Sequence, residues 1–184
     1  MAFDTIGAPQ FGLNDCKIAT WNATDDYEAA VDVPSIQMMG SVLQIVSAQL
    51  EGDDEITATA SRAIGGEVRI RFGSVSIAAL EVLLGNTSTA SGAVQDHLAV
   101  DGGDNMPYFG ICGKALAEEG AGDLHVFMPK VKITSDVELA SLEYGAFAIP
   151  ELTAQAVPDA TYYIVNLVEH STSVAVAIPP TNIS

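Results

Sequence analysis

Strict alternation of polar and apolar side chains is the feature that most constrains the fold of this chain. In ITATASR at 56–62, apolar and hydroxyl-bearing residues alternate, and EVRIRF at 67–72 repeats the pattern with charged residues. A period of two is typical of a strand with one face toward solvent. Further strands are predicted at 15–21, 41–50, 108–116, 124–133, 136–149, 161–169 and 172–178. Because Gly, Pro and polar turns separate these segments, the sequence predicts a mainly β fold, a β-sandwich or barrel.

One segment, SIAALEVLLG, changes to a helical period. Its apolar residues Ile77, Leu80 and Leu84 fall on one face of a helix. The serine before them is a favourable N-cap, and the glycine after them is a typical residue just beyond a helix C-terminus. The sequence therefore predicts one short α-helix flanking the sheets, at residues 76–84.

The other segments are interpreted as connections within a single domain. A chain of 184 residues has the length of one domain. We expect an extended N-terminal arm at 1–14, and a long loop or hairpin around 50–66. Residues 86–105 are small and polar, show no clear period, and are predicted to form an exposed loop.

The chain is unusually apolar and poor in charge for a soluble monomer. Apolar residues make up 48% of it and charged residues only 17%, and the mean hydropathy is +0.28. Folding alone buries about 70% of the surface of a chain of this size, and the remainder here would still be rich in apolar groups. Since obligate interfaces are apolar at their centre, the composition favours burial against other copies of the chain.

The charge excludes several classes of partner. The chain has 24 acidic and 7 basic residues, a net charge of −17. Proteins that bind nucleic acid through its phosphates need a basic surface, and so do proteins that dock on anionic membranes. No run of about 20 apolar residues predicts a membrane span. The first ten residues, MAFDTIGAPQ, lack the basic and apolar regions of a secretory signal, and none is expected.

No motif predicts an enzyme, a cofactor or a metal. The chain has no dinucleotide or phosphate-binding glycine loop, no CxxC, no HExxH and no GxSxG. His97 is predicted in a loop and His125 and His170 in two separate strands, each as an ordinary solvated or strand-face residue. The acidic segments at 51–55 and 101–105 lack the ligand spacing of a calcium loop and are interpreted as solvated turns.

The cysteines and the largest aromatic residues are interpreted as packing residues. Cys16 and Cys112 are too few for a disulfide scaffold, and we expect both to be reduced and buried. Trp21, Tyr162 and Tyr163 could line a ligand site, although packing in the core or at an interface is the favoured interpretation.

Taken together, these elements resemble the major tail tube protein of long-tailed bacteriophages. The resemblance lies in the order of the elements and their local sequence rather than in one specific motif, and the end of the chain carries it least. The segments concerned are FGLNDCKIATW at 11–21, the block from GSVLQIVSAQL to EVLLG at 40–85, MPYFGICGKAL at 106–116, GDLHVFMPKVKI at 122–133, and the strands at 136–149 and 161–178.

The resemblance implies a structural protein of the virion that is made in the cytoplasm of a bacterial host. Six subunits would form a ring whose inner sheets join into one barrel, and stacked rings would form the tail tube through which the genome leaves. The arm and the long hairpin would reach between neighbours and rings. Implied partners are other copies of the chain and the tape-measure, tail-tip and tail-terminator proteins, with DNA passing without sticking and no membrane involved.

Other functions stay open at this stage. A capsid-decoration or head–tail connector protein would also be acidic, β-rich and oligomeric. The tube of a contractile injection device shares the tube fold. A ligand-binding β-sandwich, for instance one that binds carbohydrate, would instead remain a monomer and expose its aromatic residues on one face.

An acidic wall suits a conduit for DNA, because carboxylates repel phosphates and release no counterions. The candidate lumen-facing residues are Glu55, Thr57, Thr59, Ser61, Glu67, Glu138 and Glu143. The candidate residues of the inter-ring loop are Glu51, Asp53 and Asp54.

Two arginines share a strand face with one of these acids. If the face that carries Glu67 lines the lumen, Arg69 and Arg71 are expected to pair with carboxylates on neighbouring strands. Glu51 and Arg62, which bracket the acidic turn, are expected to pair across the hairpin.

Overall fold

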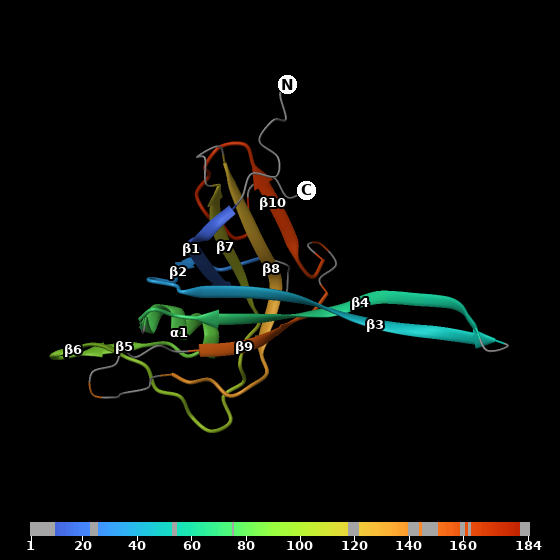
Figure 1. Ribbon diagram of the computed structural model, residues 1–184. Coiled ribbons are helices and arrows are strands. Elements are labelled where there is room, and N and C mark those ends of the chain that lie inside the picture. The colour runs from blue at the N-terminus through green and yellow to red at the C-terminus, as the bar shows by residue number, and fades with distance from the viewer. Residues whose placement is uncertain are drawn as a thin grey trace.

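The computed structural model of the chain is mainly β with one short helix, as the sequence predicts (Figure 1). It describes residues 10–22, 26–52, 55–74, 76–117, 122–139, 144, 151–158, 161 and 163–180. The elements are β1 (Gln10–Thr20), β2 (Val31–Asp32), β3 (Met38–Gly52), β4 (Glu55–Arg71), α1 (Ile77–Leu84), β5 (Thr89–Ser91), β6 (Val94–His97), β7 (Phe109–Ala117), β8 (Asp123–Ile133), β9 (Glu151–Ala156) and β10 (Asn166–His170).

Eight strands form one antiparallel sheet: seven follow the order β2-β1-β7-β8-β9-β4-β3, and the eighth, β10, pairs with β8. β8 joins its two halves: β7 pairs with one edge of β8, and β10 and β9 share the other. In Figure 1, β3, β4 and β9 run across the steeper strands β1, β7, β8 and β10. β5 and β6 form a separate two-stranded hairpin.

The main core lies on one face of this sheet and beneath α1. Val68, Ile70 and Phe72 of the alternating segment at 67–72 are buried there, while the intervening Arg69 and Arg71 are exposed. The period-two prediction is therefore confirmed for this part of β4. The largest fully buried apolar side chains of the main core are Phe109, Ile18, Ile70, Leu83, Ile111 and Met128.

A second, smaller core covers the opposite face of β7 and β8. It contains Cys112, Phe127 and Val176, the last from the segment 171–180 that follows β10. Cys16 belongs to the main core instead, so the sheet lies between the two thiols. Both cysteines are free and buried, as predicted, and loss of hydration raises the pKa of Cys112 to about 12.

Local caps fix the helix where the sequence places it. The Ala79 N–H donates to Ser76 Oγ at 3.3 Å, and Gly85 takes a left-handed conformation (φ 76°) and donates its N–H to the Glu81 carbonyl at 2.8 Å. A Cβ at Gly85 would also lie 3.0 Å from the Pro107 ring, so glycine fits both the backbone and the space. In the described part of the chain, no helix is long and apolar enough to cross a membrane.

Replacing Ser76 with alanine is expected to lower the free energy of unfolding by about 1 kcal/mol, because an N-terminal N–H of α1 loses its acceptor. The measurement is urea denaturation followed by circular dichroism. Ser76→Asp keeps an acceptor and is expected to stay close to wild type. Equal losses in the two variants would show that the cap does not stabilise the helix.

Two predicted connections contain strands. The predicted arm at 1–14 overlaps β1, which begins at Gln10, and residues 1–9 lie outside the described part. A shift in register after Phe11, with Gly12 at a φ of 70°, breaks the alternation that would reveal this strand. The predicted loop at 86–105 contains the β5–β6 hairpin, whose turn uses Gly92 at a φ of 63°.

Several strands near the C-terminus differ from the prediction. In the expected strand at 136–149, Glu138 forms only an isolated bridge to Glu151, and residues 140–143 and 145–150 lie outside the described part. The expected strand at 161–169 begins only at Asn166, because Tyr163 has a φ of 64° that an extended strand does not allow. β9 was not predicted.

The alternation at 172–178 reflects burial rather than strand pairing. This segment forms no strand but lies over the second core, with Val176 buried and Val174 partly buried. Its backbone forms hydrogen bonds with side chains of the sheet: the Val174 N–H donates to the Asp123 carboxylate, and the Val174 carbonyl accepts from the Lys114 ammonium.

Candidate functional site: a projecting hairpin and a charged sheet face

The long hairpin of β3 and β4 is the most prominent feature of the molecular surface. The two strands pair along their whole lengths, from Met38 opposite Arg71 to Gly52 opposite Glu55. Along β4, only residues 66–71 are paired with β9. Within the described residues, the outer part of the hairpin therefore has no other strand beside it. Figure 1 shows this part reaching far beyond the rest of the molecule.

The hairpin exposes apolar side chains that water solvates poorly. Leu50 is 63% exposed and Val46 51%. The large exposed apolar residues described on β3 and β4 are Met38, Val42, Leu43, Ile45, Val46, Leu50, Ile56 and Ile64. A two-stranded hairpin alone is at most marginally stable in water, and clustered apolar exposure marks an interaction surface. The hairpin therefore has the properties of a segment that packs against another chain.

Near its tip, the register divides the hairpin into an apolar and a polar face, because neighbouring side chains on a strand point to opposite sides. Closer to the body, the polar face also carries the exposed Ile45. The apolar face pairs Leu50 with Ala58, Ala48 with Ala60, and Val46 with Arg62; the polar face pairs Gln49 with Thr59 and Ser47 with Ser61. Thr59 and Ser61 thus lie on the polar side of β4, as the alternation predicts. Glu55 and Thr57 also belong to β4, but their side chains lie outside the described set.

The expected pair between Glu51 and Arg62 is wrong. Glu51 lies opposite Ile56, and Arg62 lies opposite Val46, well away from the turn. Because Gly52 pairs with Glu55, a residue as close to the tip as Glu51 can face only a residue of β4 that is equally close to the tip. Asp53 and Asp54, predicted at this tip, lie outside the described residues.

Two arginines of β4, Arg69 and Arg71, pair with acids, and one of the two pairs is as predicted. Arg71 forms an ion pair with Glu151, its cross-strand partner on β9. Arg69 pairs instead with Glu67 of its own strand, at 2.7 Å between Nε and Oε1, which corrects the expectation of a cross-strand partner. The two residues are separated by two positions and therefore lie on one face of the strand.

A cleft of about 450 Å³ gathers these charges. Arg69, Arg71, Asp136, Glu138 and Glu151 are among the residues that line it. Glu138, predicted as a lumen-facing residue, therefore shares a hollow with two arginines and other acids rather than standing on a purely acidic wall. Glu143 lies outside the described residues.

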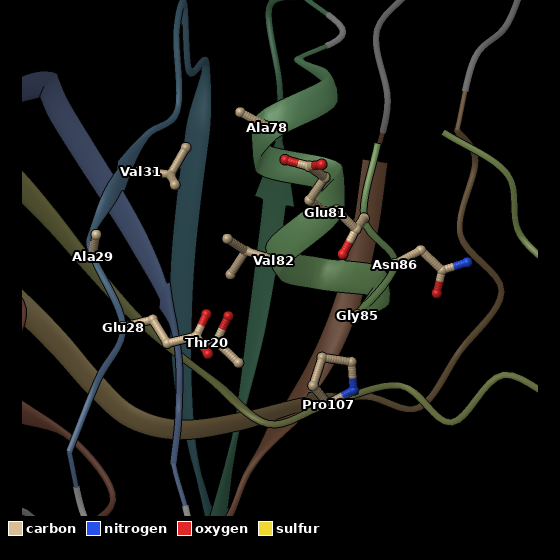
Figure 2. A pocket seen from close by; sticks show the side chains of 11 residues that line it. Thr20, Glu28, Ala29, Val31, Ala78, Glu81, Val82, Gly85, Asn86 and Pro107 are labelled. Atoms are coloured by element: carbon tan, nitrogen blue, oxygen red, sulfur yellow. The ribbon is translucent and has the colours of Figure 1, made fainter. Parts of the chain in front are cut away.

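A second hollow, of similar volume, lies between the end of β1 and α1 (Figure 2). Glu28 and Glu81 contribute its carboxylates, and the residues that line it include no histidine, cysteine, lysine or arginine. The Ser88 N–H donates to Glu81 Oε1, and hydrogen bonding from Ser88 lowers the pKa of Glu81 below its usual value. Glu81 is therefore held as a carboxylate and is not prepared to donate a proton at neutral pH.

The aromatic residues singled out by the sequence are in different environments. Trp21 packs edge-on against Tyr108, with 5.8 Å between ring centroids, and the Lys130 ammonium lies 3.7 Å from its ring centroid. This is a cation–π contact within the chain, which supports the packing interpretation of Trp21. Tyr163 is 71% exposed, and Tyr162 lies outside the described residues.

A buried polar cluster, which the sequence did not predict, lies between β7, β8 and β10. It contains Lys114, Asp123, His125 and His170, and we call it the polar cluster. Lys114 Nζ lies 2.9 Å from Asp123 Oδ2 and donates to Ser173 Oγ at 2.9 Å and to the Val174 carbonyl at 2.6 Å. The Lys114 and Asp123 side chains are 9% and 0% exposed, so this ion pair is shielded from water.

The cluster perturbs the ionisation of its members. Burial acts to raise the pKa of Asp123, but hydrogen bonds from Lys114 and the Val174 N–H outweigh it and lower that pKa. For His125, burial has the opposite effect and lowers the pKa, because it disfavours the charged imidazolium; the Asp123 carboxylate opposes this effect. His125 is therefore neutral at pH 7, and it is buried rather than solvated because the segment 171–180 covers its face of the sheet. His97 is exposed and lies on β6 rather than in a loop.

Comparisons of the chain with protein-family models and with curated proteins find no match. The features of the chain that bear on its function are the projecting hairpin, the charged cleft and the strongly acidic composition.

Proposed function

We propose that this chain is a structural protein that assembles with copies of itself into stacked six-membered rings, forming the tail tube of a long-tailed bacteriophage. The observation that carries the proposal is the projecting β3–β4 hairpin with its uncovered apolar face. In the virion, the tube would be a conduit for the genome, in contact with tape-measure, tail-tip and tail-terminator proteins.

The free edge of β3 supports a sheet that continues between subunits. β3 is fifteen residues long and ends the order of strands, so one whole edge has no strand partner among the described residues. A long open edge promotes uncontrolled pairing in a monomer, and pairing it with a neighbouring copy removes that liability. Repeated around a ring, such pairing would close the sheets into one barrel.

The apolar face of the hairpin supports contact beyond the edge. Contact with another subunit would remove three apolar side chains of this face from water: Val46, Ala48 and Leu50. The hairpin extends far enough from the body to make such a contact (Figure 1). The low content of charged residues, 17%, agrees with a chain that buries much of its surface against copies of itself.

The net charge of −17 supports a wall that does not hold DNA. Repeated six times in each ring, the charge would repel phosphates collectively, and no counterions would be released on contact. We retain Thr59 and Ser61 as candidate lumen residues, since both are exposed on the polar face of β4. Glu67 lies opposite Val42 and therefore on the other face of the hairpin, together with Val46.

Size-exclusion chromatography with light scattering, over a range of protein concentrations, tests the proposal. We expect assemblies whose masses are multiples of that of a six-membered ring, and at high protein concentration assemblies large enough to sediment. We expect the assembled protein to bind no double-stranded DNA at physiological salt. A chain that stays monomeric at every concentration would favour a ligand-binding β-sandwich and contradict the proposal. A closed trimer that does not grow would favour a capsid-decoration protein and would equally contradict it.

A further inference from the structure

We propose that Asp123, His125 and His170 of the polar cluster bind a divalent transition-metal ion of the zinc type. This site is independent of the proposed assembly. It would fasten the end of β10, and the segment 171–180 after it, to the central strand β8.

The strand register brings the three side chains together. Asp123 and His125 are two residues apart on β8 and therefore point to the same face of the sheet. His170, the last residue of β10, lies directly opposite Asp123 in the β8–β10 pair. The His125 and His170 rings are 4.6 Å apart, centroid to centroid, in an edge-on arrangement.

The ligand atoms are buried and have no hydrogen-bond partner. Among the described residues, Asp123 Oδ1, both ring nitrogens of His125 and Nε2 of His170 are inaccessible to water and unsatisfied. Native structures contain few such atoms, because each one loses its hydration without compensation. A single metal ion would take up three of these four atoms: Asp123 Oδ1, one ring nitrogen of His125, and His170 Nε2.

The distances are close to those of a metal centre. Asp123 Oδ1 lies 3.3 Å from His125 Nε2, and one potential ligand atom from each residue lies within 4.8 Å of the others. Zinc bonds of about 2.0–2.1 Å in a tetrahedral arrangement place neighbouring ligand atoms about 3.4 Å apart. The aspartate and His125 already meet that spacing, and a small displacement of His170, at the end of its strand, would complete it.

The surroundings of Asp123 leave one oxygen for the metal. The Val174 N–H donates to Oδ2 at 2.7 Å, and Lys114 Nζ lies 2.9 Å from the same oxygen. Hydrogen bonding of this kind orients metal-binding carboxylates. The Lys114 charge also opposes a dication, so we expect weaker binding than at a four-ligand structural zinc site.

The donor set selects the metal. Two neutral imidazoles and one carboxylate suit Zn²⁺, Co²⁺ or Ni²⁺, whereas Mg²⁺ and Ca²⁺ prefer oxygen ligands alone. With three protein ligands, a water molecule would complete a tetrahedral site.

Metal titration of the purified chain tests this site. We expect one equivalent of CoCl₂ to produce visible absorption bands of coordinated Co²⁺. ZnCl₂ at about 100 times its dissociation constant is expected to raise the melting temperature by about 5–10 °C. MgCl₂ at the same concentration is expected to have no effect.

Two variants make the test specific to the cluster. His170→Gln removes a ligand at a partly exposed position, and His97→Gln removes an exposed histidine outside the cluster. Circular dichroism confirms that each variant is folded before titration. Loss of the cobalt bands and of the zinc shift in His170→Gln, with both kept in His97→Gln, is the expected result. No response in the wild-type chain, or an unchanged response in His170→Gln, would overturn the proposal.

Discussion

Aspartate in place of both Val46 and Leu50 is expected to abolish assembly while leaving the chain folded. Both side chains lie on the apolar face of the outer hairpin and are more than half exposed, so the monomer loses little packing when they change. In the proposed tube they would be buried between subunits, and an unpaired carboxylate in an apolar contact is strongly unfavourable. The effect is therefore expected on association and not on folding.

The polar face of the same strand provides the matched control. Ser47→Asp with Gln49→Asp introduces the same two charges on β3, at exposed positions opposite Ser61 and Thr59. Light scattering measures assembly and circular dichroism measures folding for both double variants. We expect the polar-face variant to assemble to a much greater extent. Equal assembly of the two variants would show that the apolar face is not an interface.

Asp123→Asn is expected to lower the free energy of unfolding by about 3–5 kcal/mol. The substitution leaves the Lys114 ammonium buried without its counter-charge, and breaking one side of a buried ion pair has costs of this size. A natural domain has only about 5–15 kcal/mol in total, so a loss of this size would remove a large fraction of the stability. The measurement is urea denaturation in buffer with a chelator, so that the ion pair is tested without metal.

An exposed pair within the same sheet is the control for this prediction. Lys17 and Asp32 are cross-strand partners with 3.4 Å between Nζ and Oδ1, and the Asp32 side chain is 72% exposed. Asp32→Asn is expected to cost about 0–1 kcal/mol, because water screens the interaction. A loss below about 1 kcal/mol for Asp123→Asn would show that Lys114 finds another environment and that the pair is not stabilising.

The features that the sequence predicted correctly are governed by neighbouring residues. The helix follows from Ser76, its apolar face and Gly85, all within ten positions. The alternation at 67–72 likewise matches the buried and exposed residues of β4. Local patterns are reliable here because the caps and the pleat of a strand act between residues that are close along the chain.

The features that the sequence missed depend on contacts between distant segments. The local pattern predicts that His125 lies on a solvated strand face, but the segment 171–180 covers this face. The sequence around His125 contains no signal for this distant contact. The polar cluster likewise forms only when β7, β8 and β10 align. Its one local signal is the spacing of Asp123 and His125, two residues apart, which places both on one face of a strand.

The wrong prediction of an ion pair between Glu51 and Arg62 has a different cause. The acidic segment at 51–55 does fall where two strands meet, but Glu51, Gly52 and Glu55 belong to the strands themselves, and Asp53 and Asp54 lie outside the described residues. The pairing of Gly52 with Glu55 sets Glu51 against Ile56, whereas a pair between Glu51 and Arg62 would require a different register of the two strands. Register depends on turn geometry, which a cluster of acidic residues does not specify.

Negative-stain electron microscopy of the concentrated wild-type chain is the most direct test of the tube proposal. We expect hollow filaments in side view and six-fold rings with a central opening in end view. Averaged images would then show the hairpins between neighbouring subunits. Fields of discrete, unassembled particles at high concentration would contradict the proposal.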